Sequence, residues 1–289
     1  MLILNSILSK ETIEKYNKDG IIKITLPSEI SQLQNEFLLD CCSFLKKWVS
    51  FETTPEKLPF DLVTLSKINR GIIGKLYKVS KRFSSSRALS CHPYFTEIAK
   101  ELMNTELISC YHLTIVRIDL PNEEKFLMPP HQDFPYIQGS MNGLTLYLTF
   151  SDITPKHGVV SIKRGTHKDG VIKVTESDSR LSSAQTEYVS TGSSSRKIQN
   201  AEKVCEIADM SKINDIHFEQ EPLSKNEAYF FHTLLLHSSE PNTSNSARIT
   251  MQIRFDDLFY EDSFNRNFPE GRSRDDLFSN NFSEYVVEN

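Results

Sequence analysis

The sequence predicts a mainly β protein whose first hundred residues are mostly helical. Apolar residues recur every three or four positions between residues 30 and 48, which indicates a helix with one buried face. After Leu107 the pattern changes to short runs rich in β-branched and aromatic residues, separated by Pro, Gly, Asn and Asp. Many short strands with turns between them are typical of an antiparallel sandwich or barrel. The runs expected to be strands are residues 111–118, 144–150, 159–162, 228–236 and 249–255.

Local signals predict the remaining N-terminal elements. Ser9 is a suitable N-cap for a helix that runs to about Lys18, and Gly20 can end it in the left-handed conformation. A strand over residues 21–26 should follow. Pro93 is favoured in the first turn of a helix, so a further helix should begin there.

A length of 289 residues allows one large domain or two small ones, since single β domains often reach this size, and length alone does not choose. We expect one domain over residues 1–289. Its parts are a helical segment to residue 106, a β core over 107–260 and a C-terminal extension over 261–289. The core contains a Ser-rich insertion, residues 175–202, which is poor in large apolar side chains. Such a composition buries little surface, so we expect a mobile excursion, and as a hypothesis a lid.

The composition excludes several classes of protein. There are 33 Lys and Arg against 38 Asp and Glu, with no basic block, which argues against a nucleic-acid partner. The N-terminal apolar run is only eight residues long and fits neither a signal peptide nor a membrane span. Five cysteines without metal-site spacing indicate reduced thiols. We therefore expect a cytoplasmic protein with a small-molecule partner; its oligomeric state stays open.

A candidate metal site begins with the segment MPPHQDFPY. His131 and Asp133 are two residues apart, so on an extended chain both side chains point the same way. Pro129 and Pro130 disfavour a helix there, which supports an extended conformation. Two imidazoles and one carboxylate leave three coordination positions open on a divalent iron. The pattern therefore predicts two ligands from one short strand and requires a third from elsewhere.

The third candidate ligand is His237, at the end of an apolar strand and before a turn-forming stretch. His232 is the rival, but its offset of five gives it the opposite parity on a strand. We take His237 as the ligand and His232 as a supporting residue.

Arg248 lies eleven positions after His237 and opens a strand with two distinct faces. Its polar face carries Arg248, Thr250, Gln252 and Arg254. A guanidinium matches a carboxylate in a planar geometry with two hydrogen bonds, so this face suits a dicarboxylate.

Taken singly, each motif has a commoner structural explanation. An isolated His-x-Asp often forms only an exposed ion pair, and a lone His on an apolar strand is more often a core residue. An Arg on a strand usually lies on a solvated face. The three motifs in this order and in a β context favour a metal site instead.

At this point the chain resembles the phytanoyl-CoA dioxygenase family. The resemblance rests on LSKETIEKYNKDG, PPHQDFPYIQGSMNGLTLYLTFSDI, HGVVSIKRGTHKDG and, most specifically, LLLHSSEPNTSNSARITMQIRF. It implies a double-stranded β-helix, a jelly-roll and cupin-like core. It also implies Fe(II) bound by His131, Asp133 and His237, 2-oxoglutarate and O2 as co-substrates, and Arg248 as the partner of the distal carboxylate. By this resemblance Thr145 and Tyr147 should lie near the co-substrate.

The resemblance implies a 2-oxoglutarate-dependent dioxygenase with succinate and CO2 as co-products. Asp133 favours hydroxylation, or a related desaturation or cyclisation, over halogenation, because family-like halogenases lack this carboxylate. For the substrate we expect a small polar biosynthetic metabolite, with Arg117, Gln138 and Asn142 as candidate contacts. Two alternatives stay open. One is a cupin-like metal hydrolase or isomerase, which leaves Arg248 without a task; the other is a non-catalytic β-sandwich binding module.

Overall fold

The computed structural model describes residues 6–110, 114–124, 127–178, 203–209, 211–214, 217–271 and 277–287. Its main sheet has the strand order β1-β8-β4-β10-β2, and β3 also pairs with β10. Every pairing in this sheet is antiparallel. The strands are β1 (Ile21–Thr25), β2 (Ile108–Cys110), β3 (Ile115–Asp119), β4 (Leu144–Thr149), β8 (Glu227–His232) and β10 (Arg248–Asp257).

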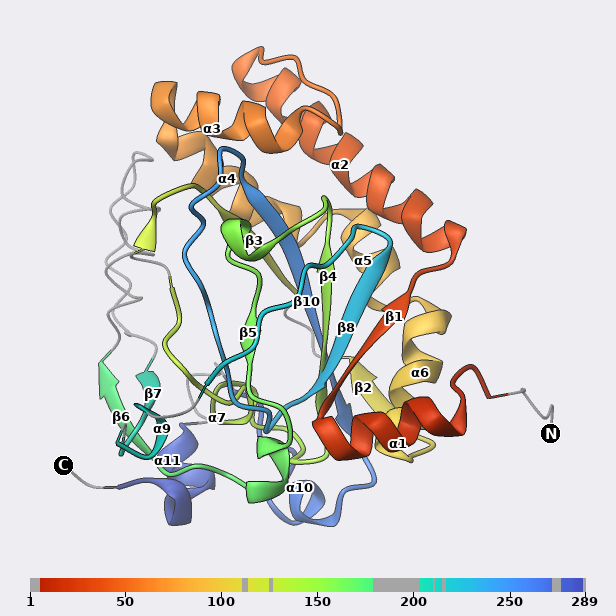
Figure 1. Ribbon diagram of the computed structural model, residues 1–289, viewed down its shortest axis with the longest axis vertical. Helices are drawn as coiled ribbons and strands as arrows, with labels where there is room; N and C mark the ends of the chain where they lie inside the picture. The colour runs from red at the N-terminus through yellow and green to blue at the C-terminus, as the bar shows by residue number, and fades with distance from the viewer. Residues whose placement is uncertain are drawn as a thin grey trace.

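Helices cover one face of this sheet (Figure 1). The expected helices are present, and three more fill the stretch between them. Ser9 caps the first through a hydrogen bond from the backbone N of Thr12, and Gly20 ends it with φ 74°. The helices are α1 (Lys10–Asp19), α2 (Ser28–Val49), α3 (Leu58–Ile68), α4 (Arg70–Ser80), α5 (Ser84–Ser90) and α6 (Pro93–Met103).

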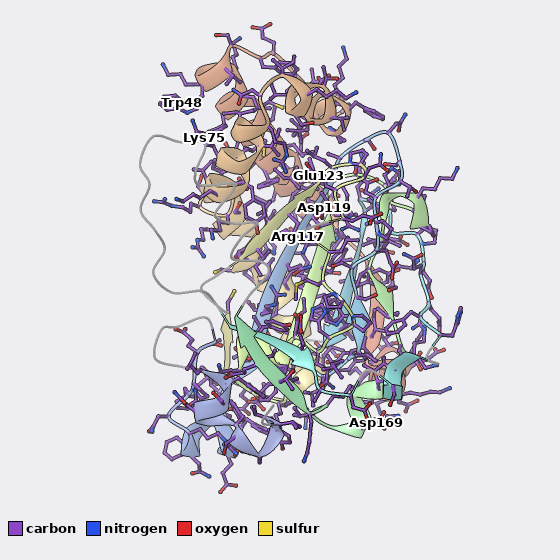
Figure 2. The ribbon with its side chains drawn as sticks, turned by 90° about the vertical axis from the view of Figure 1, so that its left-hand side faces the viewer. Trp48, Lys75, Arg117, Asp119, Glu123 and Asp169 are labelled. Carbon is purple, nitrogen blue, oxygen red and sulfur yellow. The ribbon has the colours of Figure 1, made fainter. Side chains whose placement is uncertain are left out.

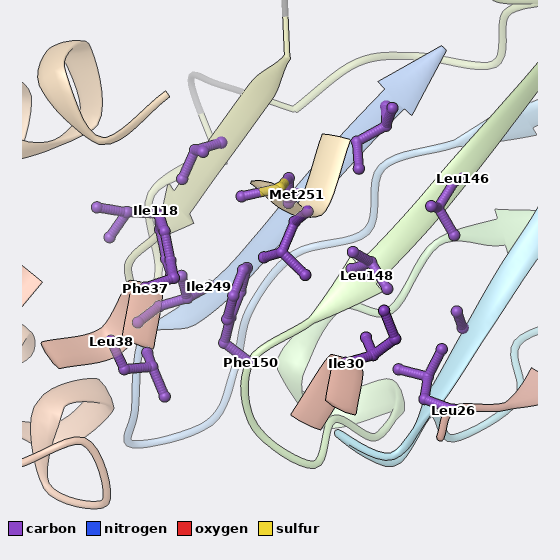
Figure 3. Close-up of a cluster of buried hydrophobic side chains, with 14 of the residues drawn as sticks. Leu26, Ile30, Phe37, Leu38, Ile118, Leu146, Leu148, Phe150, Ile249 and Met251 are labelled. Carbon is purple, nitrogen blue, oxygen red and sulfur yellow. The ribbon is translucent and has the colours of Figure 1, made fainter. Parts of the chain in front are cut away.

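The main core lies between the sheet and α2. Phe37 of α2 is fully buried, with its ring centroid 4.3 Å from that of Phe150 (Figure 3). Leu146 and Leu148 of β4 point into this layer, and so does Met251 of β10. The intervening residues of these strands point to the opposite face. The predicted two-sided strand is therefore confirmed, with its apolar side under the helices.

The second layer of the barrel is short. It contains β5 (Ser161–Ile162) paired with β9 (His237–Ser238), extended by single-residue bridges from His131 to His237 and from Ile162 to Glu219. Four chain segments therefore lie side by side. The predicted strand over 228–236 is wrong at its end, because β8 stops at His232 and a turn precedes His237.

The ends of the expected insertion meet in a hairpin. β6 (Val174–Asp178) pairs with β7 (Lys203–Ile207), and Asp178 faces Lys203 in the register. Residues 179–202, on which the expected excursion and lid depend, lie outside the described residues. Beside the hairpin lie α11 (Phe278–Asn281) and the short α9 (Ser211–Asn214), while α10 (Glu261–Asn265) lies apart from it at the same end of the molecule (Figure 1). Within the described part of the chain, no helix is both long and apolar enough to cross a membrane.

Candidate metal centre

Two of the predicted ligands come from distant segments joined by a backbone pair. The N–H of His131 donates to the carbonyl of His237 at 2.9 Å, and the reverse hydrogen bond is 3.0 Å long. The imidazole ring centroids are 4.2 Å apart. The antiparallel bridge thus places both imidazoles on the same side of the short layer.

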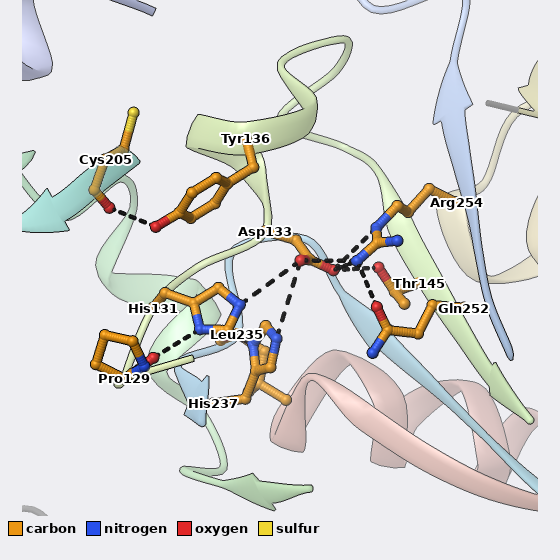
Figure 4. A network of polar contacts seen from close by, with 10 residues as sticks. All are labelled: Pro129, His131, Asp133, Tyr136, Thr145, Cys205, Leu235, His237, Gln252 and Arg254. Carbon is orange, nitrogen blue, oxygen red and sulfur yellow. Dashed lines mark hydrogen bonds and ion pairs between the residues drawn. The ribbon is translucent and has the colours of Figure 1, made fainter. Parts of the chain in front are cut away.

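The side chain of Asp133 lies beside the two imidazoles, but its backbone conformation differs from the predicted one. Its backbone is helical, with φ −69° and ψ −31°, and it directly precedes the single turn α7 (Phe134–Ile137). The expectation of two ligands on one extended strand is therefore wrong for Asp133, because the chain bends after His131. The bend still brings Oδ1 of Asp133 to 3.9 Å from Nε2 of His131 and 3.9 Å from Nε2 of His237 (Figure 4).

His131, Asp133 and His237 form a group able to hold one metal ion, with one candidate ligand atom from each within 4.8 Å of the others. His232 lies elsewhere, with its ring centroid 5.1 Å from that of His167. The choice of His237 by strand parity used an incorrect premise, because the two histidines do not share a strand. In the described residues this is the one such group.

The hydrogen bonds of the two imidazoles leave Nε2 available. Nδ1 of His131 lies 2.8 Å from the carbonyl oxygen of Pro129, and Nδ1 of His237 lies 2.9 Å from that of Leu235. A carbonyl only accepts, so each Nδ1 carries the proton and each Nε2 keeps its lone pair. Burial lowers the pKa of His131 to about 3 and also lowers the pKa of His237. Both rings are therefore neutral at pH 7, as metal ligation requires.

Asp133 is held by two neighbours that motif reading did not assign to it. Oδ2 accepts a hydrogen bond of 2.6 Å from Oγ1 of Thr145, and Arg254 donates to both carboxylate oxygens, with its shortest contact at 3.1 Å (Figure 4). Burial alone would raise the pKa of Asp133, but the guanidinium of Arg254 and the hydrogen bond from Thr145 lower it below its ordinary value. The carboxylate is therefore ionised and oriented before any metal binds.

The group opens into a cavity of about 110 Å³. One water needs roughly 10–15 Å³ measured in this way, so the cavity accommodates a small ligand. Arg248, Arg117 and Tyr147 line it together with the three candidate ligands. Tyr147 and Arg248, which we expect to contact the co-substrate, thus line the same cavity as the candidate ligands, whereas Thr145 does not line it and instead hydrogen-bonds to Asp133.

Arg248 forms a buried ion pair at its end of the cavity. Its Nε and Nη2 donate to Oδ2 of Asp119, at 3.2 and 2.9 Å. Arg117 donates to the same carboxylate, at 2.7 Å from Nη2 (Figure 2). Burial would raise the pKa of Asp119, but the two guanidinium groups lower it below its usual range. Asp119 thus holds two arginines beside the cavity.

Two of the predicted substrate contacts do not line this cavity. Oε1 of Gln138 accepts from Nδ2 of Asn281 at 2.8 Å, so this side chain ties α7 to the C-terminal extension. Nδ2 of Asn142 donates to the carbonyl of Met103 and to Asp257, each at 2.9 Å. Both are held in structural contacts. Of the three predicted substrate contacts, only Arg117 lies at the cavity.

Asp119 and Arg254 are the residues of the site that sequence reasoning did not assign. Asp119 shares a strand face with Arg117, two positions away, and Arg254 shares one with Arg248. Strand parity places both on the inner face. The cross-strand register that sets Asp119 opposite Arg248 needs the structure.

The donor set fits a divalent transition metal. Two neutral imidazoles and an ionised carboxylate on one side leave the cavity side open, the arrangement that suits non-haem Fe(II). Fold and site together define a double-stranded β-helix enzyme of the 2-oxoglutarate-dependent oxygenase type. The phytanoyl-CoA dioxygenase (PhyH) family matches residues 77–250, more than half of the chain. The chain belongs to that family. No curated protein matches the chain.

Solved structures share the fold at low sequence identity. The non-haem α-ketoglutarate-dependent carbocyclase SnoK from nogalamycin biosynthesis has a TM-score of 0.55 and 16% identity, covering 92% of each chain. The epimerase SnoN, in complex with Fe3+, α-ketoglutarate and nogalamycin RO, has a TM-score of 0.54 and 14% identity, covering 86% of this chain and 83% of that one. EctD from S. alaskensis, in complex with 2-oxoglutarate and 5-hydroxyectoine, has a TM-score of 0.52 and 10% identity, covering 90% of this chain and 80% of that one.

Proposed function

We propose that the protein is an Fe(II)- and 2-oxoglutarate-dependent dioxygenase that hydroxylates a C–H bond of a small polar metabolite. The observation that carries the proposal is that His131, Asp133, His237 and Arg248 line one cavity. A metal at the first three and a carboxylate at Arg248 would fix both ends of a dicarboxylic 2-oxo acid. Family membership and the TM-scores of the neighbours support the enzyme class.

The chain's contribution begins with its ligands. His131 and His237 present neutral Nε2 atoms, while Thr145 and Arg254 hold the carboxylate of Asp133 toward them. When bound, Fe(II) with 2-oxoglutarate and O2 would supply the oxidising power to break a C–H bond, with succinate and CO2 as co-products. The protein then has to place one C–H bond of the substrate near the metal and exclude water.

Arg248 would bind the distal carboxylate of the co-substrate. It is 3% exposed, and a charge-assisted hydrogen bond is strengthened where water is excluded. The phenol of Tyr147 lines the same part of the cavity, and burial keeps it neutral by raising its pKa. Asp119 keeps the guanidinium of Arg248 in place for this contact.

Hydroxylation is the reaction we infer, because Asp133 supplies a third protein ligand at the position that halogenases keep free for chloride. The similar folds of a carbocyclase and an epimerase belong to proteins with other reaction outcomes. For the substrate, the polar wall that includes Arg117 favours a small polar metabolite. We further infer that residues 1–289 act as one catalytic domain and that the protein works in the cytoplasm.

A metal hydrolase or isomerase with the same three ligands is the competing function. Arg248 already has Asp119 as a partner, so its presence alone does not exclude that alternative, and co-substrate binding has to be measured directly. Under anaerobic conditions the protein with Fe(II) should give a weak visible charge-transfer band on addition of 2-oxoglutarate. With air and a panel of polar metabolites, succinate should form fastest with the true substrate. Fe(II) binding without such a band would contradict the proposal.

A further inference from the structure

A second pocket lies at the far end of β10 from Arg248, outside the metal group. It is formed by the last residues of β10, by the edge strand β2 and by the segment that follows α10. Its volume is about 180 Å³, against about 110 Å³ for the cavity at the metal group. Of the described residues, only Ile137 of α7 lines both spaces. The second pocket is therefore a neighbour of the first and has its own walls.

The charged residues that line this second pocket are all acidic. They are Asp256, Asp257 and Glu270, and no Lys, Arg or His among the described residues lines it. Arg254, two positions before Asp256, donates to Asp133 instead. A pocket lined by charges of one sign attracts ligands of the other sign. The lining therefore selects a cation.

Asp256 is a buried carboxylate whose charge has no cationic partner in this lining. It is 8% exposed, and both of its hydrogen bonds are long. Oδ1 accepts from the backbone N of Ser140 at 3.2 Å, and Oδ2 accepts from Oγ of Ser109 at 3.4 Å. A carboxylate offers about four acceptor positions, and a buried one is normally paired with a cation. Burial raises the pKa of Asp256 to about 6, so at pH 7.5 the group is charged.

The other two acids have different roles. Asp257 is fully engaged in the fold, because Oδ1 accepts from Oγ1 of Thr105 at 2.7 Å and Oδ2 accepts from Nδ2 of Asn142 at 2.9 Å. Glu270 is exposed at the rim of the pocket. Asp256 is thus the group that can hold a ligand inside the pocket.

Two glycines make room for this carboxylate. A Cβ at Gly139, which has φ +57°, would lie 2.5 Å from Oδ1 of Asp256, and one at Gly143 would lie 3.1 Å from the same atom. A side chain at Gly139 would therefore displace the carboxylate. Because the backbone encloses Oδ1, Oδ2 is the oxygen left for a ligand, and its one contact is the long hydrogen bond from Ser109.

The pocket suits an organic cation better than a metal ion. Within the described part of the chain, three ligand atoms come within 4.8 Å of one another only at His131, Asp133 and His237, so the acids of this pocket do not converge on one point. One water needs roughly 10–15 Å³ measured in this way, so the pocket accommodates a molecule of several heavy atoms. Its apolar lining, which can contact an alkyl group, includes Ile137, Leu258, Phe268 and Pro269.

We propose that this pocket binds a small organic ammonium ion, which donates to Oδ2 of Asp256 and to the hydroxyl of Ser109. An ammonium group has N–H donors and no acceptor, which matches a wall of oxygen atoms without cations. The bound amine would touch Ile137, Gly139 and Ser140, which follow soon after Asp133 in the sequence. The site is separate from the metal group, and this inference does not rest on the proposed function.

The probe for the test is propylammonium, with 1-propanol as its neutral counterpart. Calorimetric titration of the full-length protein at pH 7.5, with and without Fe(II), should show saturable binding of propylammonium and none of 1-propanol. Asp256→Asn should weaken propylammonium by about tenfold or more, the loss expected when a charged hydrogen-bond partner is removed. Ser109→Val, a substitution that suits a strand, should weaken it by about threefold or more. Asp152→Asn makes the same change in net charge at an exposed turn and should bind like wild type.

Several results would overturn the inference. The first is a wild-type protein that does not bind propylammonium, and the second is equal binding by wild type and Asp256→Asn. An equal loss in Asp152→Asn would mean that only the net charge of the protein matters. Binding of 1-propanol as tight as that of propylammonium would reveal an apolar pocket without charge recognition. Propylammonium binding that disappears when Fe(II) is added would place the cation at Asp133 instead.

Discussion

His131 and His237 are each other's backbone partners, joined by hydrogen bonds of 2.9 and 3.0 Å although they lie 106 positions apart in the sequence, since 237 − 131 = 106. Each imidazole also bonds the carbonyl oxygen two residues before its own position, Pro129 and Leu235. The two ligands are therefore oriented by the same local hydrogen-bond pattern. Their separation is fixed by a β-bridge and does not depend on the flexibility of either loop.

This pairing predicts a clear division between the two histidines of the 232–237 segment. His237→Ala should abolish the anaerobic Fe(II)·2-oxoglutarate band, as should His131→Ala and Asp133→Ala, because each removes one of three ligands. His232→Ala should keep the band, since its ring packs near His167. Absorbance titration checks this. Loss of the band in His232→Ala with retention in His237→Ala would reverse the assignment.

A second prediction concerns Arg248. Arg248→Ala should weaken 2-oxoglutarate by about 2–5 kcal/mol, the usual cost of removing one partner of a desolvated charge pair, and leave Fe(II) affinity close to wild type. Arg164→Ala is the control, because Arg164 pairs with Asp19 and Glu219 outside the cavity lining. Calorimetric titration of the Fe(II) protein measures both. Equal binding by Arg248→Ala and wild type would favour the hydrolase or isomerase alternative.

Thr145 should tune the metal site without ligating it. Thr145→Val removes the hydrogen bond of 2.6 Å to Asp133 and should lower Fe(II) affinity roughly 10- to 100-fold, as is usual for partners that orient a ligand. Thr149→Val is the matched control: Thr149 lies on the same face of β4, and its hydroxyl donates to the carbonyl of Ser151. A competition titration with a metal-sensitive dye distinguishes them. Equal metal affinities in the two variants would count against the role of Thr145.

A fourth prediction uses Asp256, whose pKa burial raises to about 6 from 3.8. The folded protein binds this proton more tightly than the unfolded chain does. The stabilisation of the fold by the protonated carboxyl group is therefore fully present below pH 3.8 and is lost as the pH rises through about 6. Above that pH the buried charge costs stability, up to about 3 kcal/mol at 1.36 kcal/mol per pKa unit. Asp256→Asn should therefore raise the unfolding free energy at pH 7.5 by about 1–3 kcal/mol and change it little at pH 4.

Urea denaturation at pH 7.5 and pH 4 tests this prediction. Asp152→Asn provides the control, because Asp152 lies at an exposed turn, where it accepts from Ser224 and Lys225. If the Asp256→Asn variant were less stable than wild type at pH 7.5, the hydrogen bonds from Ser140 and Ser109 would contribute more to stability than the desolvation of the charge costs.

The sequence predicts the elements whose ends carry strong local signals. Ser9 and Gly20 delimit α1, and Pro93 begins α6. The helices α3, α4 and α5 were not individually predicted. None has a side-chain hydrogen bond at its N-cap, α4 contains Gly71 and Gly74, and α5 begins with three serines. Such residues are weak helix formers, so tertiary packing determines these helices.

For the site, sequence motifs were enough to name the three candidate ligands and Arg248, but not their conformation. Asp133 sits at a bend, and a turn separates His232 from His237, so strand parity did not apply to either pair. The pairing of Arg248 with Asp119 depends on which residues face each other across β3 and β10. Contacts of this kind join residues 129 positions apart, and no local pattern encodes them.

The two faces of β10 obey different constraints and can be varied separately. Met251 and its neighbours on the helix side fill a closed volume, where an altered side chain leaves a void or a clash. On the other side, Arg248, Gln252 and Arg254 line the cavity, so the charge and length of these side chains determine which ligand can bind. A combinatorial library restricted to alternate positions of this single strand would thus sample new ligand preferences on an unaltered scaffold. A one-residue insertion in the strand would move the apolar side chains to the cavity face and the polar side chains under the helices. Both the core packing and the binding site would then be lost.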